Sequence, residues 1–287
     1  MNHECNANAI DEQSNIQNYE SLQKIRLGHK QRLGLLGGLM SPSYFDTPRP
    51  HLLAHRGLNQ HRADIDENSL AAFDQAIAAG CTHLESDVHA TKDGVAVLFH
   101  DDDLLRVAGL PQKISDLTFH ELSQIRLKFG STIPSLDSVL AAYPQLRLNL
   151  DVKSEGAIYP TAQAINSTGA HNRVLVSSFS SSRRRKTLRL LSAPVATSAS
   201  MREVLLLLTS NFFFGLGAKQ ISKNIHALQI PVSQGPIRLA TKSFIGLLRR
   251  HNLEVHFWTI NNSQEAKKLI ALGATGIVSD RIDLIEF

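Results

Sequence analysis

The sequence predicts an α/β protein, a closed TIM (β/α)8 barrel with a short β-hairpin extension after the second strand. The first observation behind this prediction is a repeated order of segments. From residue 51 onward, short apolar runs alternate with amphipathic segments of helical spacing, and this order is typical of parallel strands joined by helices. The second observation is size, because 287 residues with 43% hydrophobic side chains suffice for one barrel of roughly 200–250 residues.

The expected strands and helices follow from that order. Nine short apolar runs are the candidate strands, at residues 51–54, 83–88, 95–100, 146–152, 173–177, 194–198, 227–230, 254–260 and 276–279. Helical patterns lie between most of them, at residues 69–79, 136–142, 157–167, 202–208, 241–250 and 263–272. Eight strands close a barrel of this class, so one of the nine is expected to lie outside it.

The strand expected outside the barrel is 95–100. Only a handful of residues separate it from the preceding strand, whereas a parallel crossover needs a dozen or more. The dipeptide Asp93-Gly94 in this gap is a strong hairpin signal, so the segment is expected to fold back antiparallel. With a two-residue turn there, His100 would lie opposite Asp87.

Residues 1–45 are expected to be a disordered or weakly helical N-terminal extension, and residues 46–287 to form the barrel. The first 22 residues are polar and have no apolar period, so they cannot bury enough surface to order themselves. The stretch 24–38 is basic, with leucines at near-helical spacing. Met40 begins a stretch that reads like a natural start, which leaves open whether residues 1–39 belong to the native protein.

The charge of the chain argues against a nucleic-acid-binding protein. The net charge of +4 is a small excess with few aromatics beside it, so no nucleic-acid partner is expected. The basic run 183–189 is expected to be a solvated helix face.

A cytoplasmic location is expected for three reasons. The chain has no apolar run of the ~20 residues that a membrane span needs, and no secretory leader is recognised. Its two cysteines are far apart in the sequence, which is typical of a reducing compartment. Peripheral membrane contact and the oligomeric state are left open.

Two predicted strands carry pairs of charged residues near their carboxyl ends. Residues two apart in a strand share a face, so Glu85 lies beside Asp87, and Asp151 beside Lys153. Buried charges are costly unless they are paired or bind a metal. Three carboxylates without a nearby cysteine favour a hard divalent cation, Mg²⁺ or Ca²⁺. A structural ion-pair network is the alternative.

Two histidines are expected at the same end of the barrel. His55 ends the first predicted strand, and the hairpin brings His100 to the carboxylates. Arg56 follows His55 directly and adds a cation. Two imidazoles flanking a metal, with an arginine nearby, are suited to acid–base catalysis of phosphoryl chemistry.

A series of motifs runs along the chain in a fixed order. It comprises His55-Arg56-Gly57, Glu67-Asn68-Ser69, Glu85-Ser86-Asp87-Val88, Thr91-Lys92-Asp93-Gly94, His100-Asp101, Asp151-Val152-Lys153, Ser178-Phe179, Trp258-Thr259-Ile260-Asn261 and Ser279-Asp280. On these residues, the chain from about 51 to 287 resembles the glycerophosphodiester phosphodiesterase family. The resemblance implies a TIM barrel, in agreement with the strand count.

The resemblance also implies roles at eight positions. These are a catalytic pair (His55, His100), substrate-binding residues (Arg56, Lys153, Trp258) and ligands of a divalent cation (Glu85, Asp87, Asp151). The chain departs from the family pattern at Asp66, where proline is usual, and at Ser69, which replaces threonine but keeps a hydroxyl able to cap a helix. Asp151 stands where glutamate is more usual, which implies a shifted or water-held metal.

The implied function is metal-dependent hydrolysis of small-molecule glycerophosphodiesters to sn-glycerol 3-phosphate and an alcohol. The attacking group is either water or the substrate's own glycerol 2-hydroxyl. One alternative is a lysophospholipase D-type lipid phosphodiesterase at a membrane surface, for which the segments 205–216 and 244–250 offer an interfacial face. The other is a non-catalytic barrel that binds a phosphate ligand.

Overall fold

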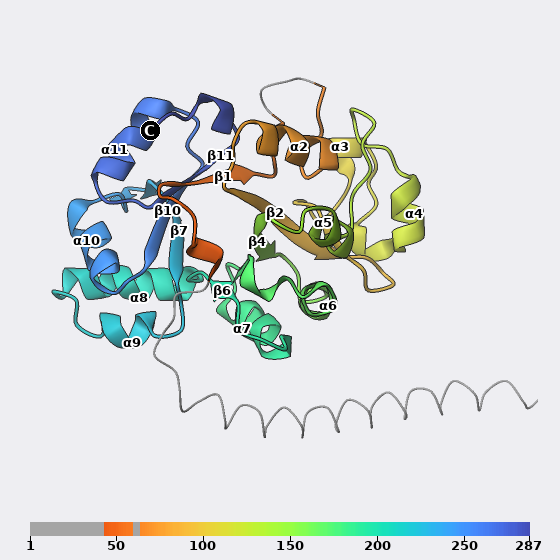
Figure 1. Cartoon of the computed structure of the whole chain (residues 1–287). Helices are drawn as coiled ribbons and strands as arrows, with labels where there is room; N and C mark the ends of the chain where they lie inside the picture. Colours follow the sequence, from red (N-terminus) through yellow and green to blue (C-terminus); the bar gives the residue numbers. More distant parts are fainter. Residues whose placement is uncertain (1–42, 60–63) are drawn as a thin grey trace, which may run out of the picture. The chain divides into compact units, whose positions relative to one another are not determined.

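The computed structural model describes residues 43–59 and 64–287, and these form the predicted barrel (Figure 1). Its strands are β1 (His51–His55), β2 (His83–Ala90), β4 (Arg147–Val152), β5 (Val174–Ser177), β6 (Ala196–Thr197), β7 (Ala227–Pro231), β10 (Glu254–Trp258) and β11 (Gly276–Ser279). They are parallel and lie in the order β6-β5-β4-β2-β1-β11-β10-β7. A parallel bridge between Ser198 and Ala227 joins the two ends and closes the barrel.

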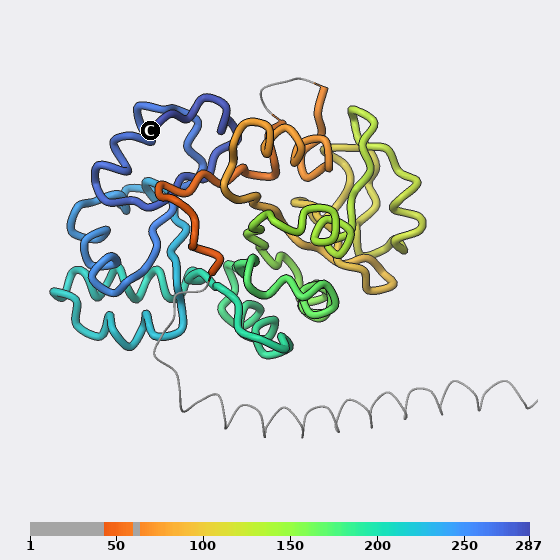
Figure 2. The backbone as a smooth tube through the Cα atoms, in the orientation of Figure 1, coloured from red at the N-terminus to blue at the C-terminus, as the bar shows by residue number. Residues whose placement is uncertain are grey.

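Helices surround the strands, as the tube in Figure 2 shows. They are α2 (Leu70–Ala78), α5 (Leu136–Ala142), α6 (Ile158–Thr168), α7 (Ser181–Leu190), α8 (Met201–Phe212), α9 (Ala218–Ser222), α10 (Lys242–Arg250) and α11 (Ser263–Ala271), with short 3-10 turns η3 (Ala170–Asn172) and η4 (Ile282–Leu284). Ser69 caps α2 as expected, because its hydroxyl accepts a hydrogen bond from the Ala72 amide at 3.2 Å. In the part of the chain that is described, no helix has both the length and the apolar character that crossing a membrane requires.

β3 (Ala96–Leu98) pairs antiparallel with β2, so the predicted hairpin is present, but its predicted register is wrong by one residue. Val88 pairs with Leu98, and the Phe99 amide donates to the Asp87 carbonyl at 2.9 Å. Phe99 therefore takes the position predicted for His100. The turn holds three residues instead of two because the Thr91 hydroxyl accepts from the Val95 amide at 2.9 Å and closes it.

A small subdomain that the apolar pattern of the sequence does not reveal follows β3. It contains α3 (Leu105–Ala108), η2 (Ile114–Asp116) and α4 (Phe119–Gln124), and it has its own apolar cluster around Leu104, Ile114 and Leu122. The Asp66 carboxylate accepts hydrogen bonds from the Phe129 and Ser131 amides, each at 3.1 Å. The aspartate that replaces the usual proline thus ties this subdomain to the barrel.

η1 (Ser43–Phe45) closes the amino-terminal end of the barrel, which we call the floor. Tyr44 and Phe45 are buried and pack against His83 and His51, with ring centroids 4.7 Å and 6.0 Å apart. The last three residues of the predicted 1–45 extension therefore belong to the barrel. The rest of that prediction concerns residues outside the described part of the chain.

The connection from β7 to α10 carries a second small hairpin, β8 (Ser233–Gln234) and β9 (Ile237–Arg238). Parallel strands all point their carboxyl ends to one side, so the loops after them gather at the end of the barrel opposite the floor. We call this end the mouth.

Candidate active site

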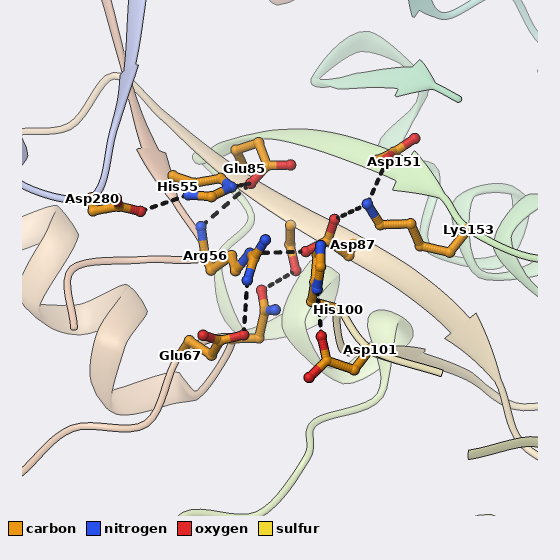
Figure 3. A network of polar contacts seen from close by, with 12 residues as sticks. His55, Arg56, Glu67, Glu85, Asp87, His100, Asp101, Asp151, Lys153 and Asp280 are labelled. Atoms are coloured by element: carbon orange, nitrogen blue, oxygen red, sulfur yellow. Dashed lines mark hydrogen bonds and ion pairs between the residues drawn. The ribbon is translucent and has the colours of Figure 1, made fainter. Parts of the chain in front are cut away.

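A cavity opens at the mouth, and all eight site residues named from the sequence line it. They are His55, Arg56, Glu85, Asp87, His100, Asp151, Lys153 and Trp258. Figure 3 shows seven of them, all except Trp258. The same cavity has an apolar wall built by Phe179, Leu205, Leu208, Ile237 and others. A polar end and an apolar side therefore share one space.

Strand register brings the three carboxylates together. Glu85 lies beside His55 across the β1–β2 pair and beside Asn149 across the β2–β4 pair. Asp87 pairs directly with Asp151. Because alternate residues of a strand face the same side, the four oxygen-bearing side chains converge at the carboxyl end of two adjacent strands.

His55 is held by a carboxylate from the other end of the sequence. Its Nδ1 lies 2.6 Å from Asp280 Oδ1, and its Nε2 lies 3.9 Å from Glu85 Oε2. The Asn261 side-chain amide donates to Asp280 Oδ2 at 2.9 Å, which fixes the carboxylate. Burial alone would lower the pKa of His55, but the hydrogen bond with Asp280 and the charge of Glu85 outweigh it and raise the pKa.

His100 forms a second histidine–carboxylate pair on the opposite side of the cluster. Its Nδ1 lies 2.6 Å from Asp101 Oδ1, and Arg106 Nε donates to the other oxygen of Asp101 at 2.6 Å. His100 and Asp87 line the same cavity. The shifted hairpin register does not remove His100 from the cavity, because the residue follows the end of β3 and is not bound by strand alternation.

Arg56 connects both sides of the site. Its Nη1 donates to Glu67 Oε1 at 3.1 Å, and its Nε lies 3.3 Å from Asp87 Oδ2 without the alignment of a hydrogen bond. The backbone turns sharply after it, with a φ of 84° at Gly57. A Cβ on Gly57 would lie within 2.9 Å of the Ala72 backbone, so only glycine fits this turn.

Lys153 bridges two of the carboxylates. Its Nζ lies 2.7 Å from Asp87 Oδ1 and 2.9 Å from Asp151 Oδ2. Burial would lower the pKa of Lys153, but the charges of Asp151 and Asp87 outweigh burial and raise it. The ammonium also lies 5.9 Å from the ring centroid of Phe179, whose ring meets Trp258 edge-on at 6.4 Å.

The cluster holds more negative charge than its own cations balance. Burial, followed by the charge of Asp87, raises the pKa of Glu85 to about 7, and burial also raises the pKa of Asp151. Asp87 Oδ2 and Asn149 Oδ1 are buried without a hydrogen-bond partner. Carboxylate and amide oxygens that accept no hydrogen bond, beside acids of raised pKa, are suited to a hard divalent cation.

A second group of potential metal ligands lies at the floor. Among the described residues, single ligand atoms of His51, Glu254 and His256 all lie within 4.8 Å of one another. The Glu254 carboxylate is paired with Arg49 and lies 3.6 Å from Arg249. Two guanidinium groups already balance its charge, so this group differs from the ligand set predicted at the mouth.

The interpretation of the run 183–189 as a solvated helix face is wrong for two of its residues. Arg184 is 3% exposed and donates to Glu203 Oε1 at 2.7 Å. Arg183 reaches the mouth side of the barrel, where its Nη1 donates to the Val152 carbonyl at 3.0 Å. Both guanidinium groups tie α7 to its neighbours, a role that charge counting in the sequence does not reveal.

Sequence reasoning gave no role to the residues that orient the predicted ones. Asp280, Asp101 and Glu67 hold His55, His100 and Arg56 respectively. Each belongs to one of the sequence motifs, so the signal was present as spacing, whereas the pairing depends on distances in space. Asn149 could have been found, because it lies two residues before Asp151 on the same strand face.

Comparison with known proteins decides the family. The model of the glycerophosphoryl diester phosphodiesterase family matches residues 55–284. The chain belongs to this family. It is 36% identical over 237 residues to the probable glycerophosphodiester phosphodiesterase 2 of Mycobacterium tuberculosis, covering 81% of this chain and 88% of that protein.

At lower identity the chain is also similar to a protein named lysophospholipase D and to a solved phosphodiesterase structure. The human lysophospholipase D GDPD1 is 25% identical over 292 residues, covering 86% of this chain and 93% of that protein. A phosphodiesterase of Oleispira antarctica, solved with the product sn-glycerol-3-phosphate, superposes with a TM-score of 0.66 at 24% identity, over 84% of this chain and 96% of that one. This structural likeness confirms the TIM barrel.

Proposed function

We propose that this chain hydrolyses glycerophosphodiesters to sn-glycerol 3-phosphate and an alcohol. One observation carries the proposal: two histidines, each bonded through Nδ1 to a carboxylate, flank a cavity that Arg56 and Lys153 also line. Phosphodiester cleavage needs a base, an acid and cations around the phosphoryl group. Family membership and the product bound to the Oleispira relative support the same reaction.

Different residues of the cavity bind different parts of the substrate. Arg56 and Lys153 bind the nonbridging oxygens of the phosphodiester, since both are cations that line the cavity. Trp258, on the apolar side next to Phe179, contacts the glycerol end of the substrate. Asp280 and Asp101 hold the imidazoles so that each presents Nε2 for proton exchange.

Proton transfer is shared between His55 and His100. One imidazole accepts the proton of the attacking hydroxyl, which belongs to water or to the substrate's glycerol 2-hydroxyl, as the new P–O bond forms. The other imidazole donates a proton to the departing alkoxide as the old P–O bond breaks. Attack by the glycerol hydroxyl gives a cyclic phosphate, which water then opens with the two roles exchanged.

Glu85, Asp87 and Asp151 would hold a divalent cation, Mg²⁺ or Ca²⁺. Asp87 Oδ2, which accepts no hydrogen bond, and the raised pKa of Glu85 support this ligand set, with Asn149 Oδ1 as a further oxygen. Bound there, the cation would neutralise charge on the phosphoryl oxygens. Lys153 pairs with Asp87 and Asp151 and holds the two carboxylates next to each other.

The direct test uses the purified full chain after removal of metal. It is assayed on a panel of glycerophosphodiesters with Mg²⁺, with Ca²⁺ or with neither, and sn-glycerol 3-phosphate is measured. We expect product with at least one cation and loss of activity in EDTA. No product from any substrate with either cation would contradict the proposal and would support a non-catalytic barrel that binds a phosphate ligand.

A second candidate is a lysophospholipase D-type activity on lipid substrates. The apolar wall of the cavity favours it, because Met201, Leu205 and Leu208 of α8 continue directly from the phosphate-binding end. The activity for which the human relative is named supports the same candidate. Lysophosphatidylcholine and glycerophosphocholine, compared under identical conditions, separate the two candidates by their ratio of kcat/KM.

We place this reaction in the cytoplasm. The free thiol of Cys81 is compatible with a reducing compartment. Cell fractionation with antibodies against the native protein tests this location, and recovery of the protein outside the cell would contradict it.

A further inference from the structure

The end of α8 and the turn after it expose a contiguous run of large apolar side chains. Phe212, Phe213, Phe214 and Leu216 are 79%, 57%, 102% and 81% exposed. Single exposed apolar residues are ordinary in proteins, whereas a contiguous group marks an interaction surface. We call the segment 212–216 the aromatic turn.

Hydrogen bonds within the chain hold the aromatic turn in shape. The Gly215 amide donates to the Ser210 carbonyl at 2.7 Å, and the Leu216 amide donates to the Phe213 carbonyl at 3.1 Å. The Ser210 hydroxyl donates to the Leu216 carbonyl at 2.7 Å. With these backbone groups satisfied internally, the turn can enter an apolar medium at low cost.

The aromatic turn lies at the mouth end of the barrel. α10 follows β7 and therefore begins at the mouth, and the Ser243 hydroxyl near its start donates to Asn211 Oδ1 at 3.0 Å. This bond holds the last turn of α8 next to the start of α10. α8 also lines the catalytic cavity through Leu205 and Leu208, so one helix joins the cavity to the aromatic turn.

The chain on either side of the aromatic turn carries formal charge of one sign, from Val204 to Leu253. No aspartate or glutamate occurs between Glu203 and Glu254. The same interval contains six basic residues: Lys219, Lys223, Arg238, Lys242, Arg249 and Arg250. Lys219, Lys223 and Lys242 are exposed and belong to the elements that follow or contact the turn. Exposed aromatics bordered by lysines match the interface of an anionic bilayer.

We propose that the aromatic turn and its lysines dock this protein on an anionic lipid bilayer, with the mouth of the cavity at the docked end. A docked mouth receives substrates derived from phospholipids where they are released. The delivery of substrate to the mouth rests on the proposed function, whereas the docking itself requires no catalysis.

Co-sedimentation of the purified full chain with vesicles tests the proposal. We expect binding to vesicles of phosphatidylcholine with phosphatidylglycerol, at least tenfold weaker binding to phosphatidylcholine alone, and weakening by 0.5 M salt. The variant Phe212→Ser/Phe213→Ser/Phe214→Ser should lose at least tenfold in partitioning. The control Leu105→Ser/Tyr159→Ser/Phe287→Ser replaces three exposed apolar residues elsewhere and should bind like the wild type.

Charge reversal gives an independent arm. Lys219→Glu/Lys223→Glu should weaken binding to anionic vesicles several-fold, whereas Lys113→Glu/Lys267→Glu, also at exposed positions, should not. Wild-type protein that stays in the supernatant would overturn the proposal, as would a triple phenylalanine variant that binds normally.

A reporter variant shows whether the turn itself enters lipid. Phe213→Trp in a Trp258→Phe background should give blue-shifted emission with anionic vesicles and quenching by brominated lipid. Unchanged emission would overturn the proposal, as would a dimer that the triple phenylalanine variant abolishes, since a second copy would then be the partner. His55→Ala should bind vesicles normally, which separates failed docking from failed catalysis.

Discussion

The two ends of this barrel carry the same residue types, histidines and carboxylates, in different surroundings. At the mouth, His55 and His100 lie among the carboxylates Glu85, Asp87 and Asp151. At the floor, His51 and His256 lie near Glu254, His83 packs against His51, and η1 covers these rings. His51 and His55 lie on the same strand, four residues apart.

The pKa values of the histidines differ between the two ends because their neighbours and their exposure to solvent differ. At the floor, burial lowers the pKa of His83 to about 3, and burial together with the two other histidines lowers the pKa of His256 well below 6.5. At the mouth, the bond with Asp280 raises the pKa of His55 despite burial. The floor therefore contributes neutral rings to packing, whereas the mouth keeps partnered imidazoles in contact with a cavity.

Removal of a mouth histidine should give the largest effect. His55→Ala or His100→Ala should lower kcat by about 10²–10⁴-fold, the usual contribution of a general acid or base. The melting temperature should stay nearly unchanged, because both rings are only partly buried. The floor variant His256→Gln is the matched control and should keep kcat within a few-fold. Near-normal turnover in either mouth variant would contradict the catalytic assignment.

The floor histidines should make the free energy of unfolding depend on pH in the acid range. A histidine whose pKa is lowered on folding takes up a proton only after unfolding, so stability is complete above 6.5 and falls as the pH decreases below that value. His256→Gln removes one such site. Between pH 5.5 and 4.5 the free energy of unfolding should fall less steeply in the variant than in the wild type. The difference between the two slopes should be about 1.4 kcal/mol per pH unit, the value for one proton.

Chemical denaturation at several pH values measures this slope. His120→Gln, at an exposed position, is the control and should keep the wild-type slope. Equal slopes for wild type and His256→Gln would show that the floor histidine does not stay neutral in the folded protein.

A hydroxyl at the floor should give the smallest effect. The Tyr44 hydroxyl is buried without a hydrogen-bond partner, so Tyr44→Phe should raise the free energy of unfolding by about 1 kcal/mol. Tyr143→Phe removes a hydroxyl that donates to Asp74 at 2.7 Å and should be neutral or slightly destabilising. Thermal melts of the two variants compare them, and destabilisation by Tyr44→Phe would mean that the hydroxyl has a partner.

The barrel, and the gathering of the eight site residues at one cavity, could be predicted from the sequence because both depend on short-range patterns. Alternation within β2 and β4 is enough to place Glu85, Asp87 and Asp151 on shared faces. The floor was not predicted, because η1 meets His51 and His83 only through the closed barrel. The hairpin register failed for a local reason, since the Thr91 side chain lengthens the turn by one residue.

Cation binding tests most directly whether the mouth is the chemically active end. Isothermal titration of the metal-stripped protein with Mg²⁺ and Ca²⁺ should detect one site in the wild type and in His256→Gln, and none in Asp87→Asn. Binding that survives in Asp87→Asn but disappears in His256→Gln would place the ion at the floor and contradict the account.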